Sequence, residues 1–390
     1  MGRATVLFGG GVLWTFQNKI KCRLYECCDR PYVSPRFDNL HRDLHELVYG
    51  QHLVLDTVEN SIRAHWTNER PKKPLVMSFH GFTGSGKNYV AEIIANNTFK
   101  NGMKSSFVHH IVATTDFPDS AKINEYKLKL RNKILEGVRK CSRALFIFDE
   151  ADKLPEQLLE SKGELSVAYW TLMWIQCLVS HFTYVLQLKL RSKILEGVRK
   201  CSRALFIFDE ADKLPEQLLE AIKPFLDYYD SVSGVDFRKS TFLFLSNRGG
   251  NVIANIILSH YQAGKPRDDL TLSNFERMLM QASYNEPGGL KFCDLISNHL
   301  VDHFVPFLPL ERQHVILCAI SYLKSQGRAD LAADDELVQS IADSLQYFPR
   351  EQEIFSSSGC KRIAAKADLE ISKRILPSLA IRHLNLDDEL

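Results

Sequence analysis

A glycine-rich loop holds the residues of this chain best suited to chemistry. It consists of Gly81, Phe82, Thr83, Gly84, Ser85, Gly86, Lys87 and Asn88. Glycines at this spacing let backbone N–H groups approach a polyphosphate, and the N-terminus of a following helix would add the positive end of its dipole. Lys87 would reach the β- and γ-phosphates, while Asn88 stands where a Ser or Thr hydroxyl normally contacts Mg²⁺. The loop predicts a site for nucleotide phosphates, with a turn that binds nothing as the alternative.

An acidic pair that follows an apolar strand pattern occurs twice in the chain. Asp149-Glu150 follows the run Ala-Leu-Phe-Ile-Phe, and Asp209-Glu210 follows a second copy of that run. In such a Walker B pattern the Asp holds a metal ion and the Glu can polarise an attacking water. We therefore expect Mg²⁺ at Asp209 or Asp149, and the catalytic carboxylate at Glu210 or Glu150.

The acidic pair is part of a longer duplication. Residues 128–160 and 188–220 match everywhere except at Asn132 and Ser192. Two old structural repeats would have diverged while keeping only their pattern, so this match indicates a recent exon duplication or a gene-model error. A single nucleotide site has a slot for one Walker B strand, and looping out either copy costs similar closure entropy. The second copy is slightly favoured, because it runs intact into the next predicted strand.

The segment between the two copies has a composition unlike its surroundings. Residues 165–186 contain no Asp, Glu, Lys or Arg over about the length that spans a bilayer. A transmembrane helix is one interpretation. Polar residues such as Gln176 and His181 reduce the hydrophobicity of the segment, which favours a poorly packed excursion instead.

Apolar patterns predict the elements that would position these side chains. Runs rich in β-branched and aromatic residues predict strands over 75–79, 107–113, 204–208 or 144–148, 241–247 and 302–310. Helical spacing predicts a helix after the loop, helices over 215–229 and 311–326, mostly helix over 332–384, and two pieces between 40 and 62 that break at 50–52. Asn247 ends the strand after Walker B, where a polar side chain can orient the attacking water. A simple turn residue is the alternative.

Composition limits the classes of function. The 390 residues suffice for one large or two medium domains, and the net charge of +2 without a basic stripe gives no support for a nucleic-acid partner. Nine cysteines leave the redox compartment open, because two of them are copies of one position. Residues 6–16 have the length of a signal-peptide core without a clear cleavage site. The ending Asp387-Asp-Glu-Leu390 differs by one residue from the Lys-Asp-Glu-Leu retrieval signal, which points weakly to the endoplasmic reticulum.

Taken together, these motifs resemble those of the torsins, Clp-like AAA+ ATPases of the endoplasmic reticulum lumen and nuclear envelope. The resemblance covers about residues 38–127 and 188–375. It is carried by Tyr49-Gly-Gln-His52, His80–Asn88 with its Asn, Phe206-Ile-Phe-Asp-Glu210, Ala221–Asp230, Phe244-Leu-Ser-Asn247, Phe304–Leu310 and Gly359-Cys-Lys361.

The resemblance implies an α/β fold of the P-loop AAA+ type. Residues 37–310 would form a three-layer nucleotide-binding domain with a central parallel sheet, interrupted at about 128–187 by the duplicated unit and insert. Residues 311–390 would form a small α-helical lid domain. Residues 1–36 would be an N-terminal segment with a signal or membrane-associating role.

The resemblance also implies roles for single residues. Lys87 would bind the β- and γ-phosphates of ATP, Asn247 would act as sensor 1 and Lys361 as sensor 2. Cys360 corresponds to a redox-sensing cysteine whose partner corresponds to Cys318, so a disulfide between them is a hypothesis, with two inert buried thiols as the alternative.

The same comparison implies an activating partner. Clp relatives carry an arginine finger where this chain has Leu300, and such a finger neutralises charge that develops on the transferred phosphoryl group. Torsins receive the arginine from the lumenal domain of a lamina-associated transmembrane cofactor, so we expect a weak ATPase with a partner of this kind. Peripheral membrane association and a homo-oligomer are compatible with the resemblance. The alternatives are a nucleotide-regulated scaffold with negligible turnover and an inactive product of exon duplication.

Overall fold

The computed structural model describes residues 22, 25–112, 190–214, 218–287 and 290–386. The first copy of the duplicated unit and the apolar segment that follows it lie outside these ranges, as do the apolar run near the N-terminus and the last four residues. Within the described residues, no helix is both long enough and apolar enough to cross a membrane.

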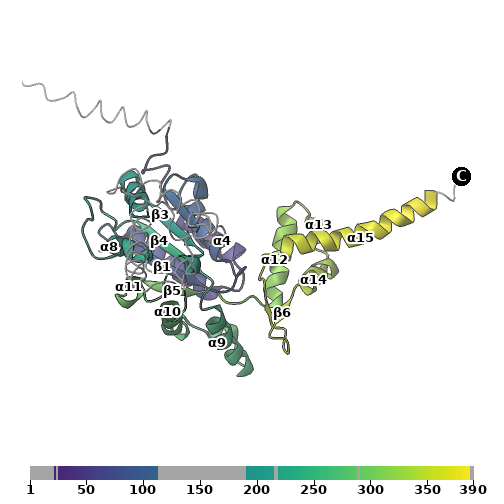
Figure 1. Cartoon of the computed structure of the whole chain (residues 1–390). Helices are drawn as coiled ribbons and strands as arrows, with labels where there is room; N and C mark the ends of the chain where they lie inside the picture. The colour runs from purple at the N-terminus through teal and green to yellow at the C-terminus, as the bar shows by residue number, and fades with distance from the viewer. Residues whose placement is uncertain (1–21, 23–24, 113–189, 215–217, 288–289, 387–390) are drawn as a thin grey trace, which may run out of the picture.

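A five-stranded parallel sheet forms the centre of the large domain (Figure 1). Its order is β2-β3-β4-β1-β5. The strands are β1 (Leu75–His80), β2 (Val108–Val112), β3 (Leu205–Asp209), β4 (Thr241–Ser246) and β5 (His303–Pro306). All residues of β1 and β4 are buried, as expected for central strands that are covered on both faces. Because all pairs are parallel, the carboxyl ends of the strands meet at one edge of the sheet.

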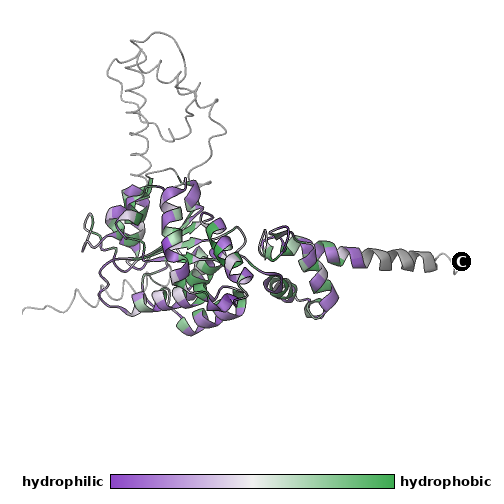
Figure 2. Ribbon diagram, turned by 90° about the horizontal axis from the view of Figure 1, so that it is seen from below, coloured by the Kyte–Doolittle hydropathy of each residue, from purple (hydrophilic) through white to green (hydrophobic). Residues whose placement is uncertain are grey.

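Alternate strand residues point into two separate cores, which makes the domain three-layered. Met77 and Leu243 point into the core beneath α2 (Phe37–Leu47), α3 (His52–Thr67) and α4 (Lys87–Thr98). Phe206 and Phe244 point into the core covered by the helix over residues 190–200, α9 (Gly250–Gln262) and α10 (Glu276–Asn285). Figure 2 shows the hydrophobic residues gathered along the strands and the inner helix faces. The predicted α/β class with a central parallel sheet is confirmed.

A small helical domain follows β5 and lies beside the sheet domain (Figure 1). It contains α12 (Arg312–Ser325), α13 (Ala329–Ala332), α14 (Asp335–Asp343), α15 (Ile363–Leu386) and a short hairpin of β6 (Tyr347–Phe348) with β7 (Phe355–Ser356). Its own core is built from residues between Leu310 and Ile371. The predicted helical lid domain is therefore present.

Two elements differ from their sequence predictions, both at prolines. The segment predicted as a helix over 215–229 contains a 3₁₀ helix over Leu218–Ile222 and a short α8 (Lys223–Leu226), with residues 215–217 outside the described ranges. Pro224 has no N–H and its ring excludes a continuous helix through this point. The strand predicted over 302–310 is only four residues long, because Pro306 and Pro309 cannot donate to a ladder.

The second copy of the duplicated unit occupies the place of the Walker B strand. Its strand β3 pairs with β2 on one side and β4 on the other. A disulfide between Cys28 and Cys201 links the N-terminal segment to the residue shortly before β3, and a second joins Cys22 to Cys27. The slot is thus filled by the copy that the sequence slightly favours.

Candidate functional site

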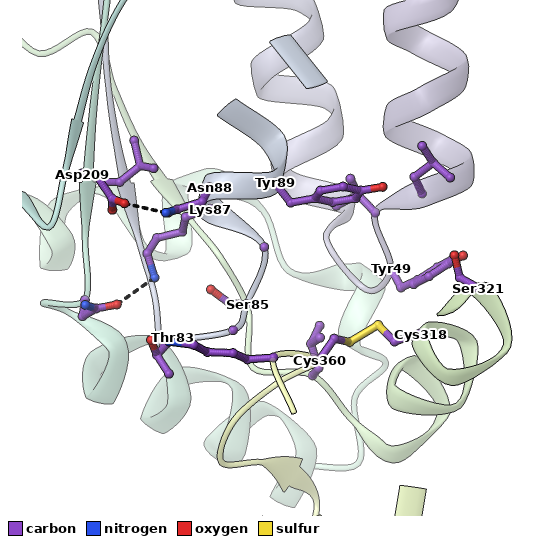
Figure 3. Close-up of a pocket in the computed structure, with 18 of the residues that line it drawn as sticks. Tyr49, Thr83, Ser85, Lys87, Asn88, Tyr89, Asp209, Cys318, Ser321 and Cys360 are labelled. Atoms are coloured by element: carbon purple, nitrogen blue, oxygen red, sulfur yellow. Dashed lines mark hydrogen bonds between the residues drawn. A yellow bond between two sulfur atoms is a disulfide. The ribbon is translucent and has the colours of Figure 1, made fainter. Parts of the chain in front are cut away.

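A cavity of about 540 Å³ lies where the carboxyl ends of β1, β3 and β4 face the small domain (Figure 3). Most of the predicted site residues line it: Thr83, Gly84, Ser85, Gly86, Lys87, Asn88, Asp209, Glu210, Asn247 and Lys361. Gly81 and Phe82 do not line the cavity, but their carbonyl oxygens accept hydrogen bonds from Lys87. Parallel pairing brings the loop, the acidic pair and Asn247 to one edge of the sheet, and Lys361 comes from the small domain.

The glycine-rich loop connects the end of β1 to the first residue of α4. Gly86 has a φ of 106°, and a Cβ added there would meet no atom within 4 Å, so the loop leaves open space at this point. Gly84 has a φ of 78°, and a Cβ there would lie 1.9 Å from the carbonyl oxygen of Ser358 in the small domain. The loop can therefore admit phosphates beside Gly86 while Gly84 packs against the lid.

Lys87 is buried at the base of the loop. Its ammonium group donates to Gly81 O at 2.7 Å, to Phe82 O at 3.0 Å and to Asn247 Oδ1 at 3.1 Å. Burial lowers the pKa of Lys87 to about 8, although the nearby carboxylates of Asp212 and Asp209 oppose this shift. The charge of Lys87 is poorly solvated, so an incoming polyphosphate would be its strongest partner.

The pKa of Lys87 predicts a falling ATP affinity above about pH 8. Phosphates bind the protonated form of Lys87. Above the pKa of the free site, ATP binding therefore requires Lys87 to take up a proton, which reduces the affinity. We expect affinity to fall about tenfold between about pH 7 and pH 9. A fluorescent ATP analogue titrated at both values measures this. Lys87→Arg, which stays charged, should give a flat profile, and an equally flat profile for the unchanged protein would contradict the assignment.

Asn88 and Asp209 meet at the position expected for the metal. Asn88 Nδ2 donates to Asp209 Oδ2 at 2.6 Å (Figure 3). His110 Nε2 lies 3.7 Å from the same oxygen. Burial raises the pKa of Asp209, but hydrogen bonds from His110, Asn88 and the Glu210 N–H outweigh it, so the net pKa is lowered. Asp209 is therefore ionised at neutral pH and, with the amide oxygen of Asn88, offers the hard oxygen donors that Mg²⁺ takes. The residues present fit Mg²⁺ with a nucleotide.

Glu210 and Asn247 lie on either side of this position. Glu210 has a φ of 53°, and its carboxylate accepts from Lys213. The backbone N–H of Asn247 donates to Asp212 Oδ1 at 3.0 Å, which leaves its side chain directed to Lys87. The structure thus places the predicted strand-end amide of Asn247 beside Lys87 and the predicted acidic side chain of Glu210 in the same cavity. His110 and Asp212 were missed, although Asp212 is part of the same acidic motif.

The small domain contributes Lys361 and a disulfide. Cys318 on α12 is bonded to Cys360, which forms the hypothesised pair (Figure 3). The N–H of Cys360 donates to Gly84 O at 3.3 Å, and a Cβ on Gly359 would lie 2.2 Å from that same oxygen. The segment that carries Lys361 is therefore in direct backbone contact with the phosphate loop.

The segment between α2 and α3 forms another wall of the cavity. Tyr49 lines it, and the buried side chain of Gln51 donates to Ser85 O and Leu308 O while accepting from Leu308 N. The break between the helices, predicted at 50–52, covers residues 48–51. Val48 and Tyr49 line the cavity, and Gln51 ties the phosphate loop to the segment that leads into the lid.

Arg267 was not identified from the sequence. Its guanidinium donates to Gly50 O at 2.7 Å, Pro309 O at 2.9 Å and Glu311 Oε1 at 3.1 Å. Gly50 lies beside the cavity and Glu311 immediately precedes α12, so one cation, whose side chain is 11% exposed, joins both domains. No local pattern distinguishes this arginine from a surface one, because its partners come from distant segments.

Leu300 is buried in the core and not directed to a neighbouring molecule. Its exposed fraction is 2%, and its carbonyl oxygen accepts from Lys73 Nζ at 3.1 Å. Lys73 also bonds Asp302, whose carboxylate accepts from the N–H of Val76 in β1. The position at which Clp relatives carry an arginine is therefore part of the structural support of the sheet.

A family model described as Torsin matches residues 22–148, and a model described as Torsin-1A, C-terminal domain, matches residues 310–369. The first match ends within the first copy, whose sequence is repeated in the second, so it does not distinguish the copies.

Two curated relatives are described as torsin-like proteins. One from Caenorhabditis elegans is 50% identical over 99% of this chain and 91% of its own length. One from Drosophila melanogaster is 32% identical over 91% of this chain and 88% of its own length. Among solved structures, an S. cerevisiae Hsp104-ADP complex and an Hsp104:casein complex in an extended conformation match with a TM-score of 0.49 each and 17% identity. These matches cover 90% and 94% of this chain, which spans about half the length of the Hsp104 chains, 48% and 52%.

Proposed function

The chain belongs to the torsin family, and on this premise we propose that it is an ATPase that converts ATP and water to ADP and phosphate, weakly by itself and faster with an activating partner. One observation supports the partner requirement most directly. The described residues that line the cavity include Lys87 and Lys361 but no arginine, and Leu300 is buried elsewhere. These two lysines would contact the phosphates, and the cation that neutralises charge on the transferred phosphoryl group would come from the partner.

The proposed mechanism assigns each step to residues of the chain. Lys87 would exchange its bonds to the Gly81 and Phe82 carbonyls for the terminal phosphates, which recovers the solvation lost by burial. Glu210 would release Lys213 and would orient and deprotonate the attacking water. Asn247 would hold Lys87 and that water in place relative to each other. Asp209 and Asn88 would hold Mg²⁺, which would supply charge neutralisation at the phosphates.

The lid contact would link nucleotide state to conformation. Lys361 and the Cys318–Cys360 disulfide belong to the small domain, yet line the same cavity as the phosphate loop. ATP would favour the closed arrangement and hydrolysis would release it, because a ligand shifts a conformational equilibrium only by contacts that differ between its states. This is the switch that a remodeller of protein or membrane assemblies requires.

The proposed partner is a lamina-associated transmembrane protein whose lumenal domain supplies an arginine. The proposed location is the endoplasmic reticulum lumen and nuclear envelope, with peripheral membrane association. Three disulfides in the described residues support it, since such bonds persist in oxidising compartments. A homo-oligomer remains compatible with this arrangement.

The test is phosphate release with and without that lumenal domain. We expect stimulation on the order of 10³-fold, lost when the partner's arginine is replaced by Ala, because a finger in trans has an effect of this size. Tight ATP binding without stimulation would favour a nucleotide-regulated scaffold. Absence of ATP binding would indicate an inactive product of exon duplication.

A further inference from the structure

Three metal-binding side chains converge on the outer surface of the large domain, away from the phosphate loop. They are His41 and His45 on α2 and Glu59 on α3. Their ligand atoms all lie within 4.8 Å of one another. His41 Nδ1 is 2.8 Å and His45 Nε2 is 3.9 Å from the same oxygen, Glu59 Oε2. Nothing in the nucleotide chemistry uses these residues.

The convergence follows from how the two helices pack. Positions four apart lie on one face of a helix, so His41 and His45 project side by side, with ring centroids 4.3 Å apart. The buried residues Leu44 on α2 and Val58 on α3 belong to the same core and hold the helices together. The three ligands are thus presented by rigid elements rather than by a loop.

We propose that His41, His45 and Glu59 form a binding site for a divalent transition metal, with Zn²⁺ as the best match. Two imidazoles and one carboxylate are a donor set that Zn²⁺ takes when a fourth position is left to water. Ligand atoms around tetrahedral Zn²⁺ lie roughly 3.3 Å apart, given bonds of about 2.0–2.1 Å. The separations of 2.8 and 3.9 Å fall on either side of that value. Small side-chain rotations would close the site.

The surroundings of Glu59 prepare one oxygen for a metal. Arg63 Nη2 donates to the other oxygen, Oε1, at 3.1 Å, and this outer bond fixes the orientation of the carboxylate. The positive charge of Arg63 opposes a dication, which makes a site of modest affinity the expectation. Both histidines are exposed, so the metal and its water have access.

Metal binding would clamp α2 to α3. The segment between these helices contains Tyr49, which lines the nucleotide cavity, and Gln51, which holds the phosphate loop. The clamp would therefore stabilise one wall of that cavity without contacting the nucleotide. Its thermodynamic signature is a melting temperature that rises with Zn²⁺ concentration, since a ligand of the folded state stabilises it by mass action.

The test is Zn²⁺ binding to the tag-free full chain, without nucleotide, by equilibrium dialysis and thermal melting. We expect one Zn²⁺ to be lost in His41→Gln and in His45→Gln, with affinity down by more than about tenfold. The matched control is His260→Gln, which changes a partly exposed histidine on α9 and should keep the site. Co²⁺ should give visible d–d bands of a tetrahedral ion in the unchanged chain and in the control only.

Two results would overturn the proposal. One is equal Zn²⁺ binding by the unchanged chain and by the two α2 variants, which would place any bound metal elsewhere. The other is a loss in His260→Gln as large as in His45→Gln, which would indicate non-specific binding. Circular dichroism of each variant checks that it is folded, and no measurement depends on ATP turnover.

Discussion

Glu210→Gln is expected to abolish ATP turnover, while the same change at Glu150 leaves turnover intact. The two glutamates have identical neighbours in sequence, so any difference comes from position in the fold. In the part of the chain that the structure describes, the strand between β2 and β4 belongs to the second copy, with Glu210 at the cavity. Loss of a positioned general base typically costs about 10²–10⁴-fold in rate, whereas ATP binding should persist because Gln keeps the shape of the side chain.

Single-turnover phosphate release in the presence of the activating lumenal domain measures this effect. The pair of variants is its own control, since each carries the same chemical change in the same local sequence. The reverse pattern, with turnover lost in Glu150→Gln and kept in Glu210→Gln, would show that the first copy occupies the slot. Equal partial loss in both would mean that the two copies exchange.

Lys87→Met is expected to reduce ATP affinity by about 100-fold or more, with little change in melting temperature. Removing one partner of a buried charged contact typically costs 2–5 kcal/mol, because the other charge is left unpaired. In the nucleotide-free protein the substitution has two opposing effects on the stability of the fold, so the melting temperature changes little. Met removes the cost of burying an ammonium group, the same burial that lowers the pKa of Lys87 to about 8. It also leaves two loop carbonyls and Asn247 without their hydrogen-bond donor.

A fluorescent ATP analogue and a thermal melt separate the two effects. Lys324→Met provides the matched control, because it makes the same change at an exposed position in the last turn of α12. ATP affinity in that variant should be unchanged. An affinity for Lys87→Met within about threefold of the unchanged protein would contradict the role assigned to the loop, because charged hydrogen bonds contribute more than this.

Much of the site could be predicted because its signals are local. The loop from Gly81 to Asn88 and the acidic pair after an apolar strand have short, fixed spacings that the chemistry requires. The central strands were recognisable because burial on both faces produces continuous apolar runs. Errors occurred where one residue overrode the pattern, as Pro224 did in the predicted helix and Pro306 in the last strand.

Residues with distant partners could not be predicted in this way. Arg267 and His110 have ordinary local surroundings, and their roles come from acceptors on other segments. The pairing of His41 and His45 with Glu59 is of the same kind, since the i,i+4 spacing of the histidines is local but the carboxylate comes from a second helix.

The amino-acid sequence is sufficient to identify one intact phosphate loop, two occurrences of the acidic pair and a leucine at position 300, where Clp relatives carry an arginine. Which acidic pair faces Lys87 follows from the tertiary structure, because two copies with the same local sequence have the same local preferences for strand and helix. The second copy is held in the sheet by contacts with distant segments: β3 lies between β2 and β4, and Cys28 is bonded to Cys201. A buried parallel sheet has one place for that strand, and contacts between distant segments select its occupant.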